Sequence, residues 1–187
     1  MNESDEWREY MNIALVVGDY SDLEAQSLRS TLECFGARVI TYWIGRPRDL
    51  MEVLSGEVLY DDINYIVFCF HGDEGEMIMG ELAEEVYEEN EPRGNFGVTE
   101  ISKYARLHNK HIFNSGCTLG NRKLAEAFLN SGAKTYIGSV DDVDGNAALM
   151  FIIRLFYGLI NHKQTITEAF QTAKTIDDET YTFQLYR

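Results

Sequence analysis

The sequence predicts an α/β fold, a mostly parallel sheet with helices on both faces. Short apolar runs of strand length alternate along the chain with stretches whose apolar residues recur at helical spacing. Such alternation is typical of strand–helix–strand units, which build parallel sheets covered on both sides. With 187 residues and 45% hydrophobic content, the chain can bury one sizeable core. We therefore expect a single domain over residues 1–187, with an N-terminal extension at 1–11 and an acidic insertion at 73–98.

The first half of the chain supplies three strands and two helices. Asn12–Val17 is a short apolar run, and Ser21-Asp22-Leu23-Glu24 after it fits a capping box that opens a helix ending near Phe35. Gly36 follows that helix and stops it. The other expected elements are a strand at 37–44, a short helix at 47–54 that begins with proline, and a strand at 63–70.

The second half continues the alternation. The expected elements are a helix at 99–107, a strand at 111–114, a helix at 119–129, a strand at 135–140 and a helix at 146–160. Thr165-Ile166-Thr167-Glu168 then opens another capped helix, and residues 181–186 alternate with period two, as a final strand would. No internal repeat interrupts this order.

Charge and cysteine content restrict the partners and the compartment. A formal net charge of −15 argues against a general binder of nucleic-acid backbones, because no run of Lys and Arg displaces counterions. Three irregularly spaced cysteines form neither a disulfide framework nor a paired zinc pattern, which favours a reducing compartment. The N-terminus is acidic where a targeting peptide is basic, and the longest apolar run, 147–153, is too short to span a bilayer. We expect a cytoplasmic protein without nucleic-acid or membrane partners.

Two strand ends carry the candidate catalytic residues. His71 follows the strand predicted at 63–70, and Cys117 follows the strand predicted at 111–114. Because the carboxyl ends of parallel strands open onto one edge of a sheet, the thiol and the imidazole are expected to meet as nucleophile and base. Small residues surround Cys117, so we expect it near the N-terminus of a helix starting around Gly120, where thiolate is favoured. Gly72 leaves its backbone N–H free to approach a substrate oxygen.

The remaining cysteines and histidines fit structural roles. A cysteine that closes a buried strand is often a small apolar core residue, an interpretation that also stays open for Cys117 and that we adopt for Cys34 and Cys69. His108 and His111 flank a helix-to-strand turn at the opposite edge of the sheet, and His162 lies in a polar loop. We expect surface roles for these three histidines.

An acidic segment follows His71. The stretch from Asp73 to Glu100 contains ten acidic residues and one basic residue, Arg93. This stretch alone therefore contributes −9 of the net charge of −15. One interpretation is a solvated surface excursion; the other is a segment that overhangs the active-site edge and shapes what enters. Residues 76–82 fit a small hairpin on that edge, and residues 84–95 resemble a mobile loop.

The order of the motifs around His71 and Cys117 along the chain resembles that of the caspase-like cysteine peptidases of clan CD, and in particular of their bacterial CHAT-type branch. The resemblance covers the second half of the fold, 111–174, together with His71-Gly72 ahead of it. The matching runs are Asn114-Ser115-Gly116-Cys117-Thr118-Leu119-Gly120, Leu124-Ala125-Glu126-Ala127-Phe128-Leu129, Gly132-Ala133, Gly138-Ser139, Val143-Asp144-Gly145-Asn146-Ala147-Ala148, Phe156-Tyr157, Glu168-Ala169-Phe170, Ala173 and Phe183-Gln184-Leu185-Tyr186.

The resemblance implies a caspase-like three-layer sandwich with a six-stranded sheet, and endopeptidase chemistry. Cys117 would attack the peptide carbonyl, His71 would protonate the leaving amine, and the backbone N–H groups of Gly72 and Cys117 would hold the oxyanion. No metal or organic cofactor is implied. The partners implied are a protein or peptide substrate and an activating protein or a second copy of the chain, in bacterial regulation or defence.

Departures from the family pattern concern substrate choice. Relatives that cleave after Arg or Lys often carry an acid where this chain has Ser115, and Asp141 stands where the family often has Trp. Together with Ser115, the carboxylates of Asp141, Asp142 and Asp144 are candidates for a pocket that takes a basic side chain. They equally fit as caps of the helix beginning at Asn146. Arg93 is a candidate self-processing point.

Three alternatives to the peptidase remain. The first is a catalytically silent caspase-like module that binds a partner through its acidic face. The second is a flavodoxin-like or receiver-type binding domain, in which Asp19 after the first strand would be the acidic loop residue. The third is a hydrolase of a small ester or amide, which would share the Cys–His pair.

Overall fold

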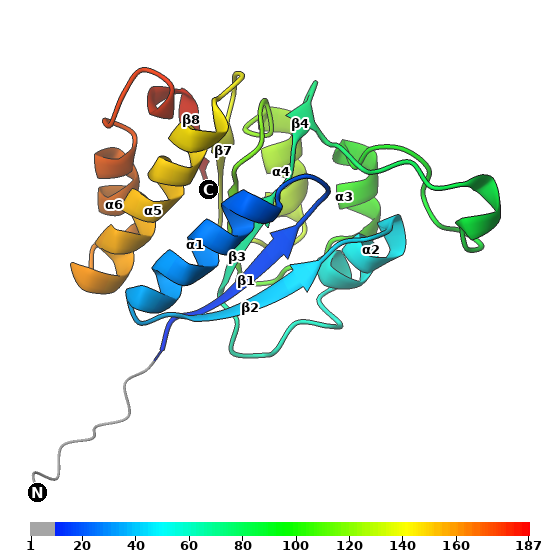
Figure 1. Ribbon diagram of the computed structural model, residues 1–187, viewed down its shortest axis with the longest axis horizontal. Helices are drawn as coiled ribbons and strands as arrows, with labels where there is room; N and C mark the ends of the chain where they lie inside the picture. Colours follow the sequence, from blue (N-terminus) through cyan, green and yellow to red (C-terminus); the bar gives the residue numbers. More distant parts are fainter. Residues whose placement is uncertain (1–9) are drawn as a thin grey trace, which may run out of the picture.

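A six-stranded sheet forms the centre of the protein, for which a computed structural model describes residues 10–187 (Figure 1). Its strand order is β2-β1-β3-β6-β7-β8; all neighbours pair in parallel except β7 and β8, which are antiparallel. The strands are β1 (Asn12–Val17), β2 (Arg38–Trp43), β3 (Tyr65–Cys69), β6 (His111–Asn114), β7 (Thr135–Ser139) and β8 (Phe183–Tyr186). The predicted extension at 1–11 lies almost wholly outside the described residues.

Helices cover both faces of this sheet. One apolar layer contains the buried faces of α1, α5 and α6, and the other contains those of α2, α3 and α4, as Figure 1 shows. Their bounds are α1 (Asp22–Cys34), α2 (Pro47–Ser55), α3 (Val98–Tyr104), α4 (Arg122–Asn130), α5 (Gly145–Asn161) and α6 (Ile166–Ala173). The predicted fold class, a mostly parallel sheet between two helical layers, is confirmed.

Burial explains why the central strands are continuous apolar runs. Residues 13–17 of β1 and 66–69 of β3 are all buried, because each of these strands packs against helices on both faces. The edge strand β2 is less enclosed, and Trp43 at its end is exposed. The residues that follow β3 and β6 are therefore carried by two central, largely buried strands.

Two expectations near the helix ends are wrong. Ser21 is the N-cap of α1, but its side chain makes no capping bond, so the capping box expected with Glu24 is absent. The helix after Cys117 begins at Arg122, where the Asn121 side chain accepts a hydrogen bond from the Lys123 N–H at 2.9 Å. Four residues thus separate Cys117 from α4, too far for a strong effect of the helix dipole.

Cys69 is buried as expected, whereas Cys34 is exposed. The buried positions of α1 are Ala25, Leu28 and Leu32, which recur at helical spacing. Cys34 lies two residues beyond Leu32 and so turns to the solvent side of the helix. The prediction that Cys34 belongs to the core is therefore wrong.

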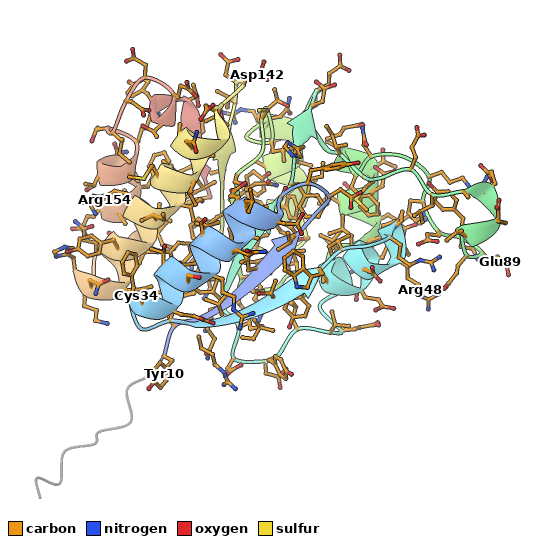
Figure 2. All side chains as sticks on the ribbon, viewed as in Figure 1. Tyr10, Cys34, Arg48, Glu89, Asp142 and Arg154 are labelled. Atoms are coloured by element: carbon orange, nitrogen blue, oxygen red, sulfur yellow. The ribbon has the colours of Figure 1, made fainter. Side chains whose placement is uncertain are left out.

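The acidic insertion has two parts. Directly after His71, β4 (Gly72–Asp73) and β5 (Glu76–Met77) form a small antiparallel hairpin, and Met77 also bridges to Phe96. Residues 80–95, here called the acidic arm, then extend sideways from the body, with Glu89 far from the loop that carries Asp142 (Figure 2). The arm includes a single 3₁₀ turn, η1 (Glu84–Val86).

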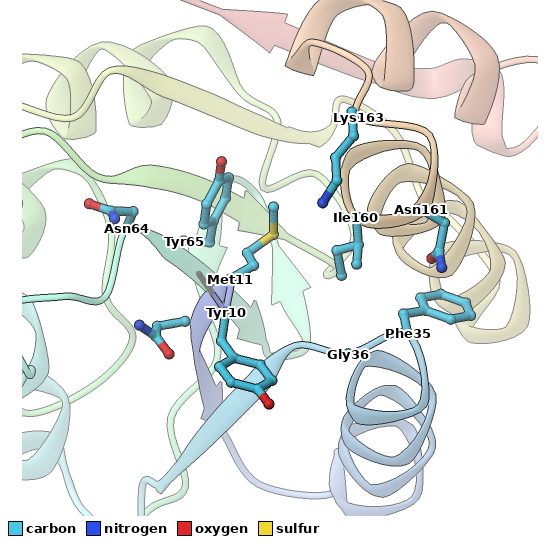
Figure 3. A pocket seen from close by; sticks show the side chains of 10 residues that line it. Tyr10, Met11, Phe35, Gly36, Asn64, Tyr65, Ile160, Asn161 and Lys163 are labelled. Carbon is cyan, nitrogen blue, oxygen red and sulfur yellow. The ribbon is translucent and has the colours of Figure 1, made fainter. Parts of the chain in front are cut away.

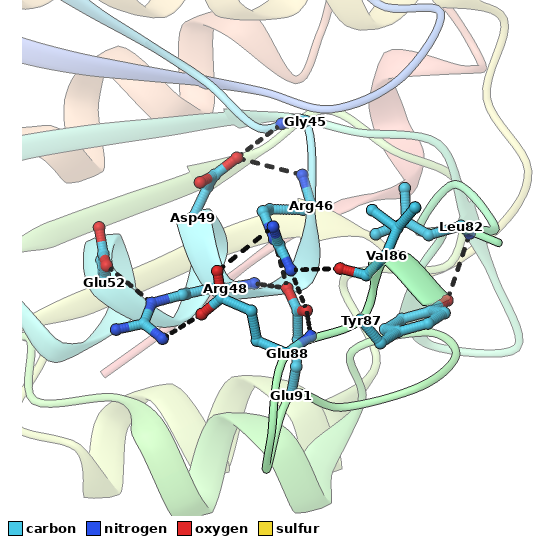
Figure 4. Close-up of polar contacts among 10 residues, drawn as sticks. All are labelled: Gly45, Arg46, Arg48, Asp49, Glu52, Leu82, Val86, Tyr87, Glu88 and Glu91. Carbon is cyan, nitrogen blue, oxygen red and sulfur yellow. Dashed lines mark hydrogen bonds and ion pairs between the residues drawn. The ribbon is translucent and has the colours of Figure 1, made fainter. Parts of the chain in front are cut away.

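An ion pair ties the acidic arm to the start of α2 (Figure 4). The Arg46 guanidinium donates to Glu91 from Nε at 2.9 Å and from Nη2 at 2.6 Å, and Nη2 also donates to the Val86 carbonyl at 2.9 Å. The Glu91 side chain is only 1% exposed, and the Arg46 hydrogen bonds, with those from backbone N–H groups, hold its pKa at about 2. The arm therefore lies beside α2, whereas the hairpin directly follows β3 at the carboxyl edge of the sheet.

Candidate active site

The sheet register aligns His71 with Cys117. Strands β3 and β6 are parallel neighbours, and Phe68 pairs with Asn114. Each candidate lies three residues beyond its member of this pair, so the two follow their strands at the same level. The prediction that both residues lie at one edge of the sheet thus agrees with the register of the central strands.

Glycines allow the two segments to touch. A Cβ atom added to Gly72 would lie 2.2 Å from the Cys117 carbonyl oxygen, and one added to Gly116 would lie 2.4 Å from the Phe70 carbonyl oxygen. Real Cβ atoms do not come so close to backbone, so a side chain at either position would push the segments apart. The glycine beside His71 and the glycine beside Cys117 are what permit the backbones to meet.

The Gly72 N–H faces the Cys117 segment. The Ile78 N–H donates to the His71 carbonyl at 3.0 Å, which makes the next pair, Gly72 and Met77, a non-hydrogen-bonded pair of the hairpin. Gly72 N lies 3.1 Å from the position of a Cβ on Gly116. This donor is therefore directed away from the hairpin and toward the nucleophile candidate.

The Cys117 thiol contacts the loop between β7 and α5. Cys117 Sγ accepts a hydrogen bond from the Val143 N–H at 3.4 Å and donates to the Val143 carbonyl at 3.5 Å. The Thr118 N–H donates to the Asp141 carbonyl at 3.1 Å, and Thr118 adopts a left-handed conformation with φ of 56°. His71 is exposed at the same edge. In this conformation the sulfur is held by Val143.

The four expected pocket residues occupy different environments. The Ser115 side chain is buried, with its hydroxyl inside the protein, so it contributes no open surface here. Asp144 is the N-cap of α5 and accepts from the Asn146 N–H at 2.8 Å, and the Asp141 carboxylate accepts from the Asp142 N–H at 2.9 Å. Asp142 is exposed at the tip of the loop (Figure 2). Asp144 is therefore a helix cap, as one of the two interpretations expected, whereas Asp142 has the side chain most available to a ligand.

A residue that the sequence reasoning did not single out lies beside this edge. Glu24, in the first turn of α1, points inward, and its Oε1 is buried without a hydrogen-bond partner among residues 10–187. Burial raises the pKa of its carboxyl, whereas the Ser115 hydroxyl and the charge of His71 act to lower it. The capping-box spacing of Ser21 and Glu24 predicts a surface position for Glu24, so nothing in the sequence indicated that this carboxyl is buried.

The two prominent cavities lie elsewhere. One of about 770 Å³ opens at the amino edge of the sheet, between the ends of α1 and α5, and is lined by residues such as Tyr10, Tyr65 and Lys163 (Figure 3). The other, of about 310 Å³, separates α2 from the acidic arm. Neither of these two cavities includes His71 or Cys117. Within residues 10–187, no group of three or more His, Cys, Asp or Glu side chains is arranged to hold a metal ion, and no helix is long and apolar enough to cross a membrane.

Comparison with known proteins gives matches to structures only. No protein-family profile and no curated sequence matches the chain. Among solved structures, the Arg-specific cysteine proteinase gingipain R superposes with a TM-score of 0.60 at 14% identity, covering 93% of this chain and 44% of its own. Saccharomyces cerevisiae separase, solved with securin, gives 0.59 at 17% identity, with 94% and 12% covered.

A secreted C11 cysteine protease from Bacteroides thetaiotaomicron, solved with an irreversible peptide inhibitor, gives a TM-score of 0.57 at 13% identity, covering 89% of this chain and 58% of its own. The chain thus spans less than two thirds of the length of each of these proteins. All three are cysteine proteases, and each likeness extends over nearly the whole described sheet. Despite the low identity, the chain has the fold of the caspase-like cysteine proteases of clan CD.

Proposed function

We propose that this protein is a cysteine endopeptidase in which Cys117 is the nucleophile and His71 the general acid and base. The observation that carries the proposal is the backbone contact of Gly72 with Cys117 at the carboxyl edge of neighbouring parallel strands. The fold shared with cysteine proteases supports it. We propose that this protein cleaves one specific protein target in the bacterial cytoplasm, as part of regulation or defence.

The proposed reaction has two halves. The Cys117 thiolate attacks the peptide carbonyl carbon, and the N–H groups of Gly72 and Cys117 stabilise the oxyanion. The C–N bond then breaks as His71 gives its proton to the leaving amine, which leaves an acyl group on sulfur. Water, deprotonated by His71, attacks this thioester, so that the new carboxylic acid leaves and the thiol is restored. No metal or cofactor takes part.

The thiol must leave Val143 before it can attack. In the observed conformation, Cys117 Sγ is hydrogen-bonded to both backbone groups of Val143. Substrate binding, an activating protein or pairing with a second copy is proposed to shift the loop at 140–144 and free the sulfur. This loop also carries Asp142, the carboxylate proposed to select a basic residue in the substrate.

Arg93 is proposed as a site where the enzyme cleaves its own chain. It lies on the acidic arm with 60% of its side chain exposed, paired with Glu84 at 2.8 Å. Mass spectrometry of the purified wild type and of Cys117→Ala tests this directly. A break after Arg93 in the wild type alone is expected, and an intact arm in a wild-type preparation with measured activity contradicts it.

Active-site labelling tests the proposed function. Wild type, Cys117→Ala, His71→Ala and Asp142→Asn are treated with peptide acyloxymethyl ketones that carry Arg, Lys, Asp or Leu as the first residue, and adducts are read by intact mass. We expect one adduct that requires Cys117 and His71, with a preference for Arg or Lys that Asp142→Asn weakens. Iodoacetamide serves as the control for simple access to the thiol.

A catalytically silent module that binds a partner is the second candidate. The hydrogen bonds between Cys117 Sγ and Val143 favour it, because they occupy the sulfur that would otherwise act. Absence of any ketone adduct, while iodoacetamide still modifies Cys117, would favour this module over the peptidase.

A further inference from the structure

Two large apolar side chains stand in solvent at the turn between β1 and α1. Tyr20 is 91% exposed and Leu23 is 81% exposed, the highest values among the exposed large hydrophobic residues of the part of the chain that the structure describes. Tyr20 directly precedes Ser21, the N-cap of α1, and Leu23 is the second residue of the helix. Side chains this exposed add little to the core, so packing within the fold does not account for them.

Tyr20 also has an unfavourable backbone conformation. Its φ of 59° lies in the left-handed region, where a bulky residue is an outlier and where Gly and Asn are found more readily. A residue at this position before a helix often packs against the fourth helical residue, which here is Ala25. Ala25 is buried while Tyr20 stays in solvent, so the tyrosine gains no such contact. The position therefore carries backbone strain that its own side chain does not offset.

The end of β1 and the segment before His71 are in direct contact. Strands β1 and β3 are parallel neighbours. The Gly18 N–H donates to the Cys69 carbonyl at 2.9 Å, and a Cβ atom added to Gly18 would lie 2.5 Å from the Phe70 ring. Tyr20 and His71 each lie two residues beyond the two ends of this hydrogen bond, so the turn stands beside the strand end that carries the candidate base.

The turn itself is fixed between α1 and the start of the acidic arm. Ser21 Oγ donates to the Asp19 carbonyl at 3.4 Å. A Cβ atom added to Gly80 would overlap the Asp19 carboxylate, so this carboxylate lies directly against the backbone where the arm begins. Contacts made by both neighbours of Tyr20 therefore determine the direction in which its side chain projects.

The strand order places Tyr20 and Leu23 on one side of the candidate catalytic residues. Four adjacent strands run in the order β1-β3-β6-β7. His71 and Cys117 follow the inner two of these strands. The turn with Tyr20 follows β1, and the loop with Asp142 follows β7. With neighbouring strands about 4.8 Å apart and an extended peptide advancing about 3.3 Å per residue, a substrate that crosses from Asp142 to Tyr20 needs about five residues.

The surroundings of the two apolar side chains are acidic. Asp19 and Asp22 are both exposed on the turn at 18–24. The neighbouring segment at 71–80, which includes the hairpin, adds three acidic residues, and neither segment contains Lys or Arg. A partner that complements both the charge and the apolar surface carries an apolar side chain next to Lys or Arg.

We propose that Tyr20 and Leu23 form a docking subsite for the substrate: they bind an apolar side chain of a basic protein segment, about five residues from the bond that Cys117 cleaves. The inference deepens the proposed function and rests on it for the cleavage step. It also accounts for the strain and the exposure of Tyr20, because a side chain that contacts a substrate must stay unpacked in the free protein. Strained residues of this kind gather where a protein binds its ligands.

Cleavage of designed peptides tests the subsite. Internally quenched peptides of about twelve residues carry one central Arg, scattered Lys, and either Leu or Ser at one position that is moved along the peptide. The measured quantity is kcat/KM for the Leu peptide divided by kcat/KM for the Ser peptide. We expect this ratio to reach about ten at a position about four to six residues from the Arg, and to fall to about one in Tyr20→Asn and in Leu23→Ser.

Tyr60→Asn is the matched control. Tyr60 is 64% exposed but lies ahead of β3, at the amino edge of the sheet, so this variant should keep the wild-type ratio. Urea unfolding of Tyr20→Asn separates docking from a structural role. Because Asn tolerates the left-handed conformation better than Tyr, the urea midpoint should stay the same or rise while the ratio falls. A lowered midpoint would mean that Tyr20 supports the fold and would overturn the proposal.

Binding to an inactive variant separates this proposal from the proposed function. In Cys117→Ala, fluorescence anisotropy measures the binding of the same peptides with a fluorescein label. Tighter binding of the Leu peptide that is lost on Tyr20→Asn, without cleavage of any peptide by the wild type, supports the docking subsite and refutes the peptidase. Ratios near one in both cleavage and binding overturn the subsite. A wild-type dimer that Tyr20→Asn separates in analytical ultracentrifugation also overturns it, because the surface then joins two copies of the chain.

Discussion

Truncation of Glu91 should release the acidic arm and lower the stability of the protein. The Glu91 carboxylate accepts four hydrogen bonds, two from Arg46 and one each from the Arg48 N–H at 2.8 Å and the Glu88 N–H at 2.8 Å. Glu91→Ala removes all four and leaves a guanidinium and two amides without their acceptor. Three of these contacts join Glu91 to residues 43 or 45 positions away, at the start of α2, so no local structure replaces them.

The size of the effect follows from the pKa of Glu91, which the fold lowers from 4.5 to about 2. At about 1.4 kcal/mol per pKa unit, lowering the pKa from 4.5 to about 2 corresponds to about 3.5 kcal/mol as an upper bound. The Arg46 side chain is 25% exposed and the contact lies in a thin surface layer, so solvent screening reduces this to about 2 kcal/mol. Because the folded pKa is depressed, this stability is present above about pH 4.5 and is lost as the pH falls toward 2.

Urea unfolding and limited trypsin digestion together measure this loss. In the Cys117→Ala background, which cannot cleave its own chain, we expect Glu91→Ala to lower the free energy of unfolding by about 2 kcal/mol at pH 7, and trypsin to cut faster after Arg93. Glu89→Ala, an exposed change on the same arm, is the matched control and should shift stability by less than about 0.5 kcal/mol. Equal behaviour of the two variants at pH 7, in both urea and trypsin, would refute the reasoning that Glu91 anchors the arm.

Three further changes test the site edge and the core. Gly72→Ala places a Cβ 2.2 Å from the Cys117 carbonyl oxygen, so the proposed oxyanion donor is displaced and ketone labelling should fall about 100-fold; labelling at the wild-type rate would contradict the close approach. Tyr136→Phe removes the buried hydroxyl that donates to the Leu119 carbonyl at 2.5 Å and should cost about 1–3 kcal/mol in urea unfolding, whereas a neutral result would mean that water replaces the bond. Thr165→Ala removes the cap of α6 and should cost about 1 kcal/mol, while the exposed change Thr175→Ala just after α6 serves as its control.

Hydrophobic periodicity was sufficient to predict the order of the elements. The expected strand at 111–114 agrees with β6, and the expected helix at 146–160 differs from α5 by one residue at each end. Parallel pairing then follows from the alternation, since both faces of β3 need helical cover. The meeting of the His71 and Cys117 segments was accessible for the same reason, because a parallel sheet brings its strand ends to one edge.

Contacts between distant segments were not accessible in this way. The Cys117 thiol pairs with Val143, which lies 26 residues further along the chain. This contact is determined by the path of the loop after β7, which sequence periodicity does not predict. Residues 84–95 have the composition of a mobile loop, yet Arg46 holds them beside α2. A single salt-bridged carboxylate enclosed by protein cannot be told apart in sequence from its exposed neighbours on the arm, since all are glutamates in an acidic run.

Glu24 illustrates why a local pattern can be right about a helix and wrong about a side chain. The capping-box spacing occurs twice, at Ser21-x-x-Glu24 and at Thr165-x-x-Glu168. Each predicts the start of a helix, and both helices form. Only Glu168 closes the box, because α6 begins in solvent, and hydrogen bonds from Thr165 lower the pKa of its carboxyl. At the start of α1 the Ser21 hydroxyl donates to the Asp19 carbonyl instead, the Glu24 side chain turns inward, and burial raises the pKa of its carboxyl. The spacing of a capping box therefore predicts where a helix begins, whereas the packing of α1 over the strand ends decides whether its glutamate closes the cap or turns into the protein.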